Sequence, residues 1–186
     1  MKRSALALIL AVLMTVCLLT IGAAADENVE YIDASGTEQT CEQATKVEES
    51  VTAWNAGWYV VSSNVTIETR ITVTGNVNLI LVDGCTLTAK KGISVTSGNS
   101  LTIYGQSTGD GVGKLIANAQ YSVGYAAIGG EDGSNGGEEA HGNITINGGI
   151  IEASSINDAA GIGSGRGPSG SAVSDKDNGT ITLNGS

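Results

Sequence analysis

Residues 71–81 read ITVTGNVNLIL and residues 93–103 read ISVTSGNSLTI, and the two stretches align without a gap at a spacing of 22 residues. Upstream, residues 65–67 (VTI) fall on residues 87–89 (LTA) at the same spacing. Apolar residues alternate with Thr, Ser or Asn, which is the periodicity of a β-strand. A period of roughly 20–50 residues is typical of a solenoid, whose units pack on their neighbours. The pattern therefore predicts that each strand stacks on its counterpart 22 residues later.

Longer units follow in the second half of the chain. Residues 143–149 (NITINGG) are echoed by 180–186 (TITLNGS), and residues 125–130 (YAAIGG) by 159–164 (AAGIGS). A third pair is LIA at 115–117 and IIEA at 150–153. The additional residues are concentrated at 131–140 and 166–176. Insertions of this kind emerge on one face of a solenoid, often its binding face.

The expected fold is an all-β parallel β-helix over residues 61–186, preceded by a leader and short N-terminal cap over residues 26–60. Within that cap, residues 41–53 fit a short helix or an irregular strand. The nearly continuous apolar run 77–82 predicts a strand covered on both faces. The sequence has no Phe, so the core must be built from Ile, Val, Leu and Ala. Because residues 180–186 begin another unit, we expect an open C-terminal coil and a chain that is the N-terminal piece of a longer array.

The N-terminus has the three parts of a secretory signal peptide: basic Lys2 and Arg3, an apolar stretch to Ile21, and small residues before Asp26. A transmembrane anchor is the alternative. Cleavage after Ala25 would leave 161 of the 186 residues and change the net charge from −10 to −12, since Lys2 and Arg3 are removed. An exported chain this acidic is a poor candidate for binding nucleic acid or anionic membranes. We expect a secreted or cell-surface protein.

Two cysteines remain after such cleavage, Cys41 and Cys85. Export permits a disulfide, but a buried free thiol is equally compatible with the sequence, particularly for Cys85 beside a predicted strand. Their redox state stays open at this stage.

Several passages resemble a known family: AGWYVV at 56–61, LILVDGCTLTAKKGI at 79–93, LTIYGQS at 101–107, GKLIA at 113–117 and AAIGG at 126–130. They are similar to secreted, cell-surface repeat proteins of Gram-positive gut anaerobes that are described as carbohydrate-binding or adhesin-like. The resemblance covers about residues 31–186. It implies a right-handed β-helix without established catalytic residues.

Aromatic residues concentrate at 54–59, where Trp54, Trp58 and Tyr59 are candidates for a sugar-stacking platform. The alternative is that the two indoles plug the N-terminal end of the predicted bore, which we favour.

Two acidic loops are candidates for calcium binding, because carboxylates and carbonyls are the ligands of Ca²⁺. Neither loop has the spacing of an EF-hand or of the nonapeptide calcium repeat, so solvated acidic loops are the favoured alternative. The carboxylates concerned are Glu131, Asp132, Glu138 and Glu139 in the first loop and Asp175 and Asp177 in the second.

The remaining ionisable residues suggest no catalytic site. His141 is the only histidine and is expected to be exposed. Arg70, Lys90 and Lys91 are expected to project outward at turns. The leading hypothesis is a non-catalytic module that binds polysaccharide or a surface glycan. The alternatives are a structural stalk of a larger surface protein, and a calcium-assisted polysaccharide lyase, whose basic proton abstractor is not evident here.

Overall fold

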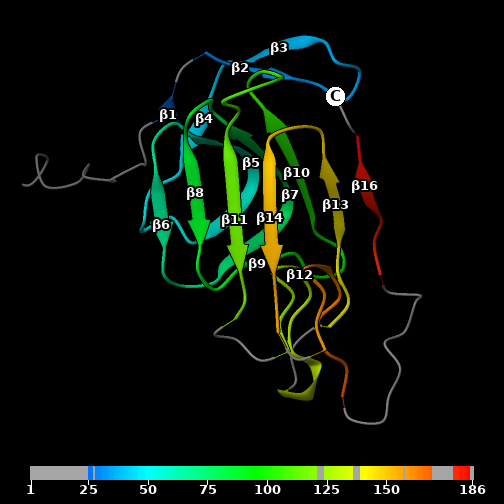
Figure 1. The fold of residues 1–186 in the computed structure, drawn as a ribbon. Helices are drawn as coiled ribbons and strands as arrows, with labels where there is room; N and C mark the ends of the chain where they lie inside the picture. Colours follow the sequence, from blue (N-terminus) through cyan, green and yellow to red (C-terminus); the bar gives the residue numbers. More distant parts are fainter. Residues whose placement is uncertain are drawn as a thin grey trace, which may run out of the picture.

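The computed structural model describes residues 25–26, 28–120, 124–135, 139–156, 158–168 and 178–184. These residues are all-β, with mostly parallel strands and no α-helix (Figure 1). Within this part of the chain, no helix has the length and apolar character needed to cross a membrane. The proposed signal peptide lies almost entirely outside the described residues and remains a prediction.

Two sheets whose strands pair mainly in parallel form the body of the molecule. The larger has ten strands, and its main path is β1 (Ala25–Asp26), β4 (Ala44–Lys46), β5 (Ala53–Val61), β7 (Ile71–Leu81), β10 (Ser100–Gly105), β13 (Asn143–Ile146) and β16 (Ile181–Leu183). Short strands β9 (Ile93–Ser94), β12 (Ile128–Gly129) and β15 (Ile162–Gly163) extend from β7. The second sheet consists of β6 (Val65–Ile67), β8 (Thr86–Ala89), β11 (Lys114–Asn118) and β14 (Ile150–Ser154).

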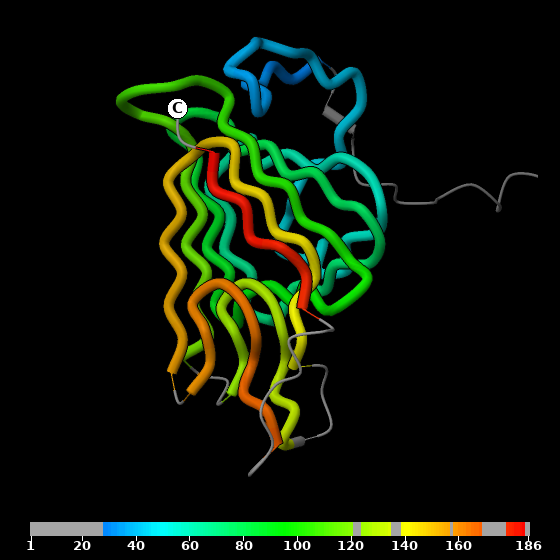
Figure 2. The backbone as a smooth tube through the Cα atoms, turned by 90° about the vertical axis from the view of Figure 1, so that its right-hand side faces the viewer, coloured from blue at the N-terminus to red at the C-terminus, as the bar shows by residue number. Residues whose placement is uncertain are grey.

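The chain passes from one sheet to the other in each successive turn. After β6 it enters β7, and later turns run β8–β9–β10, β11–β12–β13 and β14–β15–β16. Figure 2 shows these turns lying against one another, with the last turn in orange and red at the outside. A 3₁₀ turn, η1 (Gly133–Asn135), lies in the loop that follows β12.

The strand pairing predicted from the 22-residue spacing is confirmed at two places: Ile71 pairs with Ile93, and Val65 with Leu87. The gap-free alignment is wrong further along, because Leu79 pairs with Ile103 and not with Leu101. The turn at residues 96–99 contributes two additional residues, so the spacing becomes 24. An even increment keeps the same alternation of inward and outward side chains.

Inward-facing residues form columns across the stacked turns. One column contains only isoleucine, at Ile71, Ile93, Ile128 and Ile162. The glycine after each of the last two allows close stacking: Gly129 has φ +137°, and a Cβ there would collide with the carbonyl oxygen of Gly163. In the repeated Ile-Gly pair, the isoleucine therefore fills the core and the glycine allows the backbones of neighbouring turns to approach closely.

The N-terminal region forms strands where the sequence suggested a loose leader. β2 (Val29–Ile32) and β3 (Glu38–Cys41) make an antiparallel hairpin at one end of the β5–β7–β10 strands (Figure 1). Of the alternatives for residues 41–53, the described residues form strands and no helix. The hairpin packs with buried Val60 and Ile80 in a second, outer core. Since Leu79 and Leu81 point into the main core, the strand expected at 77–82 is covered on both faces at residues 79–81, whereas Asn78 is partly exposed.

Candidate functional site

Three aromatic rings meet on the outer face of the ten-stranded sheet. Tyr31 comes from β2, Trp58 from β5 and Tyr104 from β10. The ring centroids are 4.9 Å apart for Tyr31–Trp58, 4.8 Å for Tyr31–Tyr104 and 5.4 Å for Trp58–Tyr104. All three rings are partly exposed. Burial is the largest cause that raises the pKa of both tyrosines above the ordinary value of 10, so their hydroxyl groups remain neutral donors at neutral pH.

A β-bulge determines which aromatic residues reach this face. Trp54 and Trp58 are four residues apart, so a regular strand would place both on the same side. The register of β5 against β7 shifts between Asn55 and Gly57, and Gly57 has φ +151°, a conformation that favours glycine. Between these two positions β7 has one residue more than β5, so the alternation of inward and outward side chains is reversed along β5. Trp54 therefore points inward and Trp58 outward.

Trp54 and Tyr59 belong to the main core. Trp54 is fully buried, and its indole N–H donates to the carbonyl of Val51 at 3.0 Å. Its ring stacks on Tyr59 at 5.3 Å, and the Tyr59 hydroxyl accepts the backbone N–H of Asn55 at 2.9 Å. Neither residue presents a free ring face to a ligand. Of the three aromatic residues selected from the sequence, Trp58 alone is partly exposed, whereas Trp54 and Tyr59 are buried. Tyr31 and Tyr104, the partners of Trp58, were missed.

A row of small polar side chains leads away from Trp58 across the sheet. In register, the successive outward positions are Trp58, Asn78, Thr102, Thr145 and Thr182. A parallel row begins with Asn76 and Ser100, whose side chains are hydrogen-bonded at 2.8 Å. Adjacent parallel strands lie about 4.8 Å apart. The face therefore offers hydroxyl and amide groups at regular intervals beside the aromatic cluster.

The acidic loop is engaged in internal contacts. Asp132 is buried and accepts from the Ser134 hydroxyl at 2.6 Å, and its Oδ2 lies 3.1 Å from a guanidinium nitrogen of Arg166. The Ser134 hydrogen bond, followed by the charge of Arg166, keeps the pKa of Asp132 below its usual range despite burial. Glu131 accepts the Ser94 hydroxyl at 2.8 Å. The first loop is thus held together by its own protein partners.

The described residues contain no group of three or more His, Cys, Asp or Glu that could hold a metal ion. Of the calcium candidates, Glu131, Asp132 and Glu139 are described, whereas Glu138, Asp175 and Asp177 lie outside the described residues. Calcium binding by the loops therefore remains a prediction, and two of its candidate ligands have other partners.

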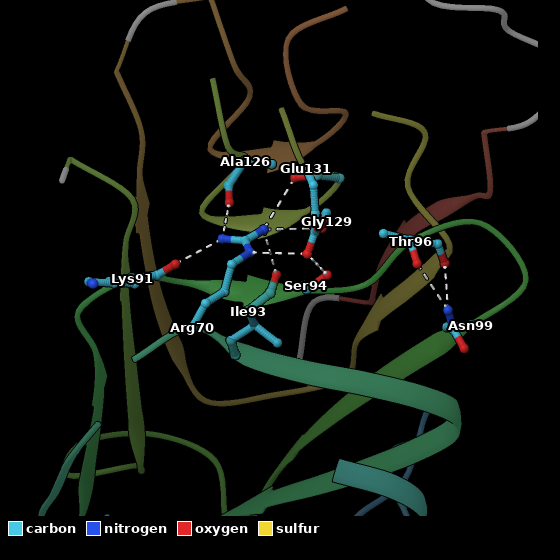
Figure 3. Close-up of polar contacts among 10 residues, drawn as sticks. Arg70, Lys91, Ile93, Ser94, Thr96, Asn99, Ala126, Gly129 and Glu131 are labelled. Carbon is cyan, nitrogen blue, oxygen red and sulfur yellow. Dashed lines mark hydrogen bonds and ion pairs between the residues drawn. The ribbon is translucent and has the colours of Figure 1, made fainter. Parts of the chain in front are cut away.

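The expectation that Arg70 projects outward is wrong. Its side chain is 13% exposed, and its guanidinium lies among carbonyl oxygens (Figure 3). It donates to Lys91 at 2.8 Å, Ala126 at 3.0 Å and Gly130 at 3.2 Å. Burial lowers the pKa of Arg70 to about 10, opposed by the nearby Glu131 carboxylate and Tyr125, so the group stays charged at neutral pH. Arg70 therefore connects the start of β7 to turns that follow it.

The expectation that His141 is exposed is also wrong. The residue is 7% exposed and buried beside Thr96, with its ring Nδ1 2.7 Å from the carbonyl oxygen of Gly142. Cys41 and Cys85 are both free thiols. Cys41 belongs to the outer core under the hairpin and Cys85 packs against the main core, which resolves the open alternative in favour of unpaired cysteines in this structure.

Comparisons of the chain with models of known protein families, with curated proteins and with solved structures found no match.

Proposed function

We propose that the chain is a secreted or cell-surface module that binds polysaccharide without catalysis, and that its stacked turns form a right-handed parallel β-helix. Strand alternation between two parallel sheets supports the fold. Its hand follows from the strong preference of crossovers between parallel strands for the right-handed form. The predicted signal peptide supports export.

The observation that carries this proposal is the aromatic cluster Tyr31–Trp58–Tyr104 at the start of the Asn78–Thr102–Thr145 row. The apolar faces of sugar rings stack on aromatic rings, which are apolar but carry polar groups at their edges. Hydroxyl and amide side chains both donate and accept hydrogen bonds, as sugar hydroxyls do. An extended glycan running across the strands would meet the rings first and then the polar row.

The test is binding of the chain to a panel of plant and host polysaccharides, with and without a calcium chelator. We expect saturable binding to one class of glycan. Trp58→Ala should weaken that binding about tenfold, because removal of an aromatic anchor typically costs more than 1 kcal/mol. Thr145→Ala should weaken it about two- to threefold, in line with the modest net value of one neutral hydrogen bond.

Thr66→Ala provides the matched control, because Thr66 is an outward-facing threonine on the other sheet. It should leave glycan binding unchanged. Binding that is unaffected by Trp58→Ala, or equally weakened by Thr66→Ala, would refute the proposed face. Loss of binding on chelation would assign calcium a role in the loops.

A structural stalk is the second candidate, and the continuous columns of core residues favour it. Such columns allow turns to be added along one axis, each stabilised by its neighbours. A stalk predicts no saturable binding to any polysaccharide. The lyase alternative has less support, because the side chains of Arg70, Lys114 and Arg166 are already engaged by carbonyl or carboxylate oxygens of the protein.

A further inference from the structure

A groove of about 530 Å³ lies on the outer face of the four-stranded sheet, away from the aromatic cluster. Its volume falls within the range of about 300–1,000 Å³ that small-ligand pockets cover. It is lined by Glu68, Thr88, Lys90, Lys91, Ile116 and Asn118. The sequence did not indicate this groove, since its residues come from two strands, β8 and β11, and from the turns that follow β6 and β8.

The floor of the groove is formed by outward positions of adjacent strands. Thr88 of β8 pairs with Ile116 of β11 in register, so a hydroxyl and an apolar side chain lie side by side. Asn118 is two residues beyond Ile116, on the same face by strand alternation. All three are partly exposed. The floor therefore combines an apolar contact with groups that exchange hydrogen bonds.

The charges stand at the ends of the strands. Lys90 Nζ lies 2.6 Å from Glu68 Oε1, which joins the strand ends of β6 and β8. Lys91 follows Lys90 and is exposed. Its carbonyl accepts the Arg70 guanidinium at 2.8 Å, which holds the backbone of this turn in place. Two lysines that are neighbours in the sequence thus line one groove of a chain whose net charge is −10.

This combination defines the chemistry of a ligand. The two lysines favour an anionic group, and Thr88 and Asn118 favour hydroxyl groups. Ile116 favours an apolar ring face. Glu68 repels a densely charged anion such as phosphate but accepts hydrogen bonds from hydroxyls. A molecule with one carboxylate, several hydroxyls and an apolar face satisfies all of these groups.

We propose that this groove binds a carboxylated sugar residue, with the carboxylate at Lys90 and Lys91, hydroxyls at Thr88, Asn118 and Glu68, and the ring over Ile116. The site lies on a different sheet from the aromatic face, so it stands whether or not that face binds glycans. The ion pair of Lys90 with Glu68 positions the Lys90 ammonium at the groove, while Lys91 supplies the second positive charge.

The test is titration of the full chain with glucuronate, glucose and inorganic phosphate, monitored by ligand-observed NMR. We expect saturable binding of glucuronate with a Kd on the order of 1 mM, and much weaker binding of glucose and phosphate. Lys91→Gln should weaken glucuronate binding about fivefold or more, because it removes a charge-assisted contact. Increased salt should weaken it as well.

Lys114→Gln is the matched control, since Lys114 lies on the same sheet but outside the groove, paired with Glu152 at 2.6 Å. It should bind glucuronate like the unaltered chain. Ile116→Ser tests the ring contact separately and should weaken glucuronate and any residual glucose binding alike. The proposal is overturned if glucuronate does not bind, if phosphate or glucose binds as well as glucuronate, or if Lys91→Gln and Lys114→Gln have the same effect.

Discussion

The second turn and the last turn of the stack carry similar apolar side chains in the same columns, yet their burial differs sharply. Leu101 and Ile103 in β10 are 0% exposed, whereas Ile181 and Leu183 in β16 are 38% and 68% exposed. Strand β10 lies between β7 and β13, while β16 pairs with β13 alone among the described residues. Burial in this molecule therefore depends on the number of stacked neighbours as much as on residue type.

On the outward sides of the two sheets, burial depends instead on whether another element covers the strands. Near the N-terminal end, the β2–β3 hairpin covers Val60 and Ile80 with an additional apolar cluster. In the last turn, Ile150 and Ile156 are 47% and 36% exposed. Since a single turn cannot bury its own side chains, stability should be concentrated where turns are stacked on both sides.

The largest expected effect is at the centre of the stack. Leu101→Ala should reduce the free energy of unfolding by about 3 kcal/mol, because it leaves a cavity in a packed core. The equivalent change in the last turn, Leu183→Ala, should alter it by less than about 0.5 kcal/mol, as for an exposed site. Equilibrium unfolding in urea measures both values. Equal losses would show that the last turn is as well packed as the second.

A somewhat smaller effect is expected at Arg70, which ties β7 to carbonyls of later turns. Arg70→Met should cost about 2 kcal/mol, since the carbonyl oxygens of Lys91, Ala126 and Gly130 lose hydrogen bonds from a charged donor. Lys91→Met is the control, because the exposed Lys91 side chain belongs to the adjacent turn. Thermal unfolding should show a reduced midpoint for the first variant and little change for the second. A midpoint unaffected by Arg70→Met would mean that the turns are held together without this contact.

The hairpin tests the covered outer face. Tyr31→Ala should destabilise the chain by about 1 kcal/mol, the value of aromatic contacts beyond simple burial, and should increase the exposure of Trp58. Glu30→Ala, on the same strand at an exposed position, should do neither. Tryptophan fluorescence quenching by acrylamide measures the exposure. Unchanged quenching in Tyr31→Ala would indicate that the hairpin is held by other contacts.

The smallest expected effect is a pH dependence of the hairpin turn. The Ser35 hydroxyl donates to Asp33 at 2.6 Å and the Thr37 N–H at 2.9 Å. These bonds, led by that from Ser35, lower the pKa of Asp33 from 3.8 to about 2. A lowered pKa means that the carboxylate stabilises the turn above pH 3.8 and that this contribution disappears as the pH falls through 2.

Acid titration of tryptophan fluorescence from pH 5 to about pH 1 should therefore show a transition assigned to the hairpin. Asp33→Asn should remove that transition, whereas Glu38→Gln, on the same hairpin, should retain it. A transition that survives in Asp33→Asn would belong to another carboxylate, such as Asp132.

Part of this fold could be predicted from the sequence, because it depends only on residues that are close together in the chain. Alternation of apolar and polar residues places Ile71 and Ile93 inward whatever their partners are, and similar patterns stack in similar places. The 24-residue spacing between Leu79 and Ile103 could not be predicted. An insertion of two residues keeps the alternation of apolar and polar residues but changes which residues pair between the strands. The candidate site was accessible only in part: Trp58 was selected, but Tyr31 and Tyr104 depend on how the hairpin docks.

By itself, the sequence determined that the chain is built from short strands with apolar residues on one face, since this follows from nearest-neighbour alternation. Tertiary structure alone decided which side chains reach the surface. A one-residue bulge sends Trp58 outward and leaves Trp54 buried. Carbonyls 56 to 60 residues away draw Arg70 inward. Contacts across that distance depend on the stacking of whole turns, which no local pattern encodes.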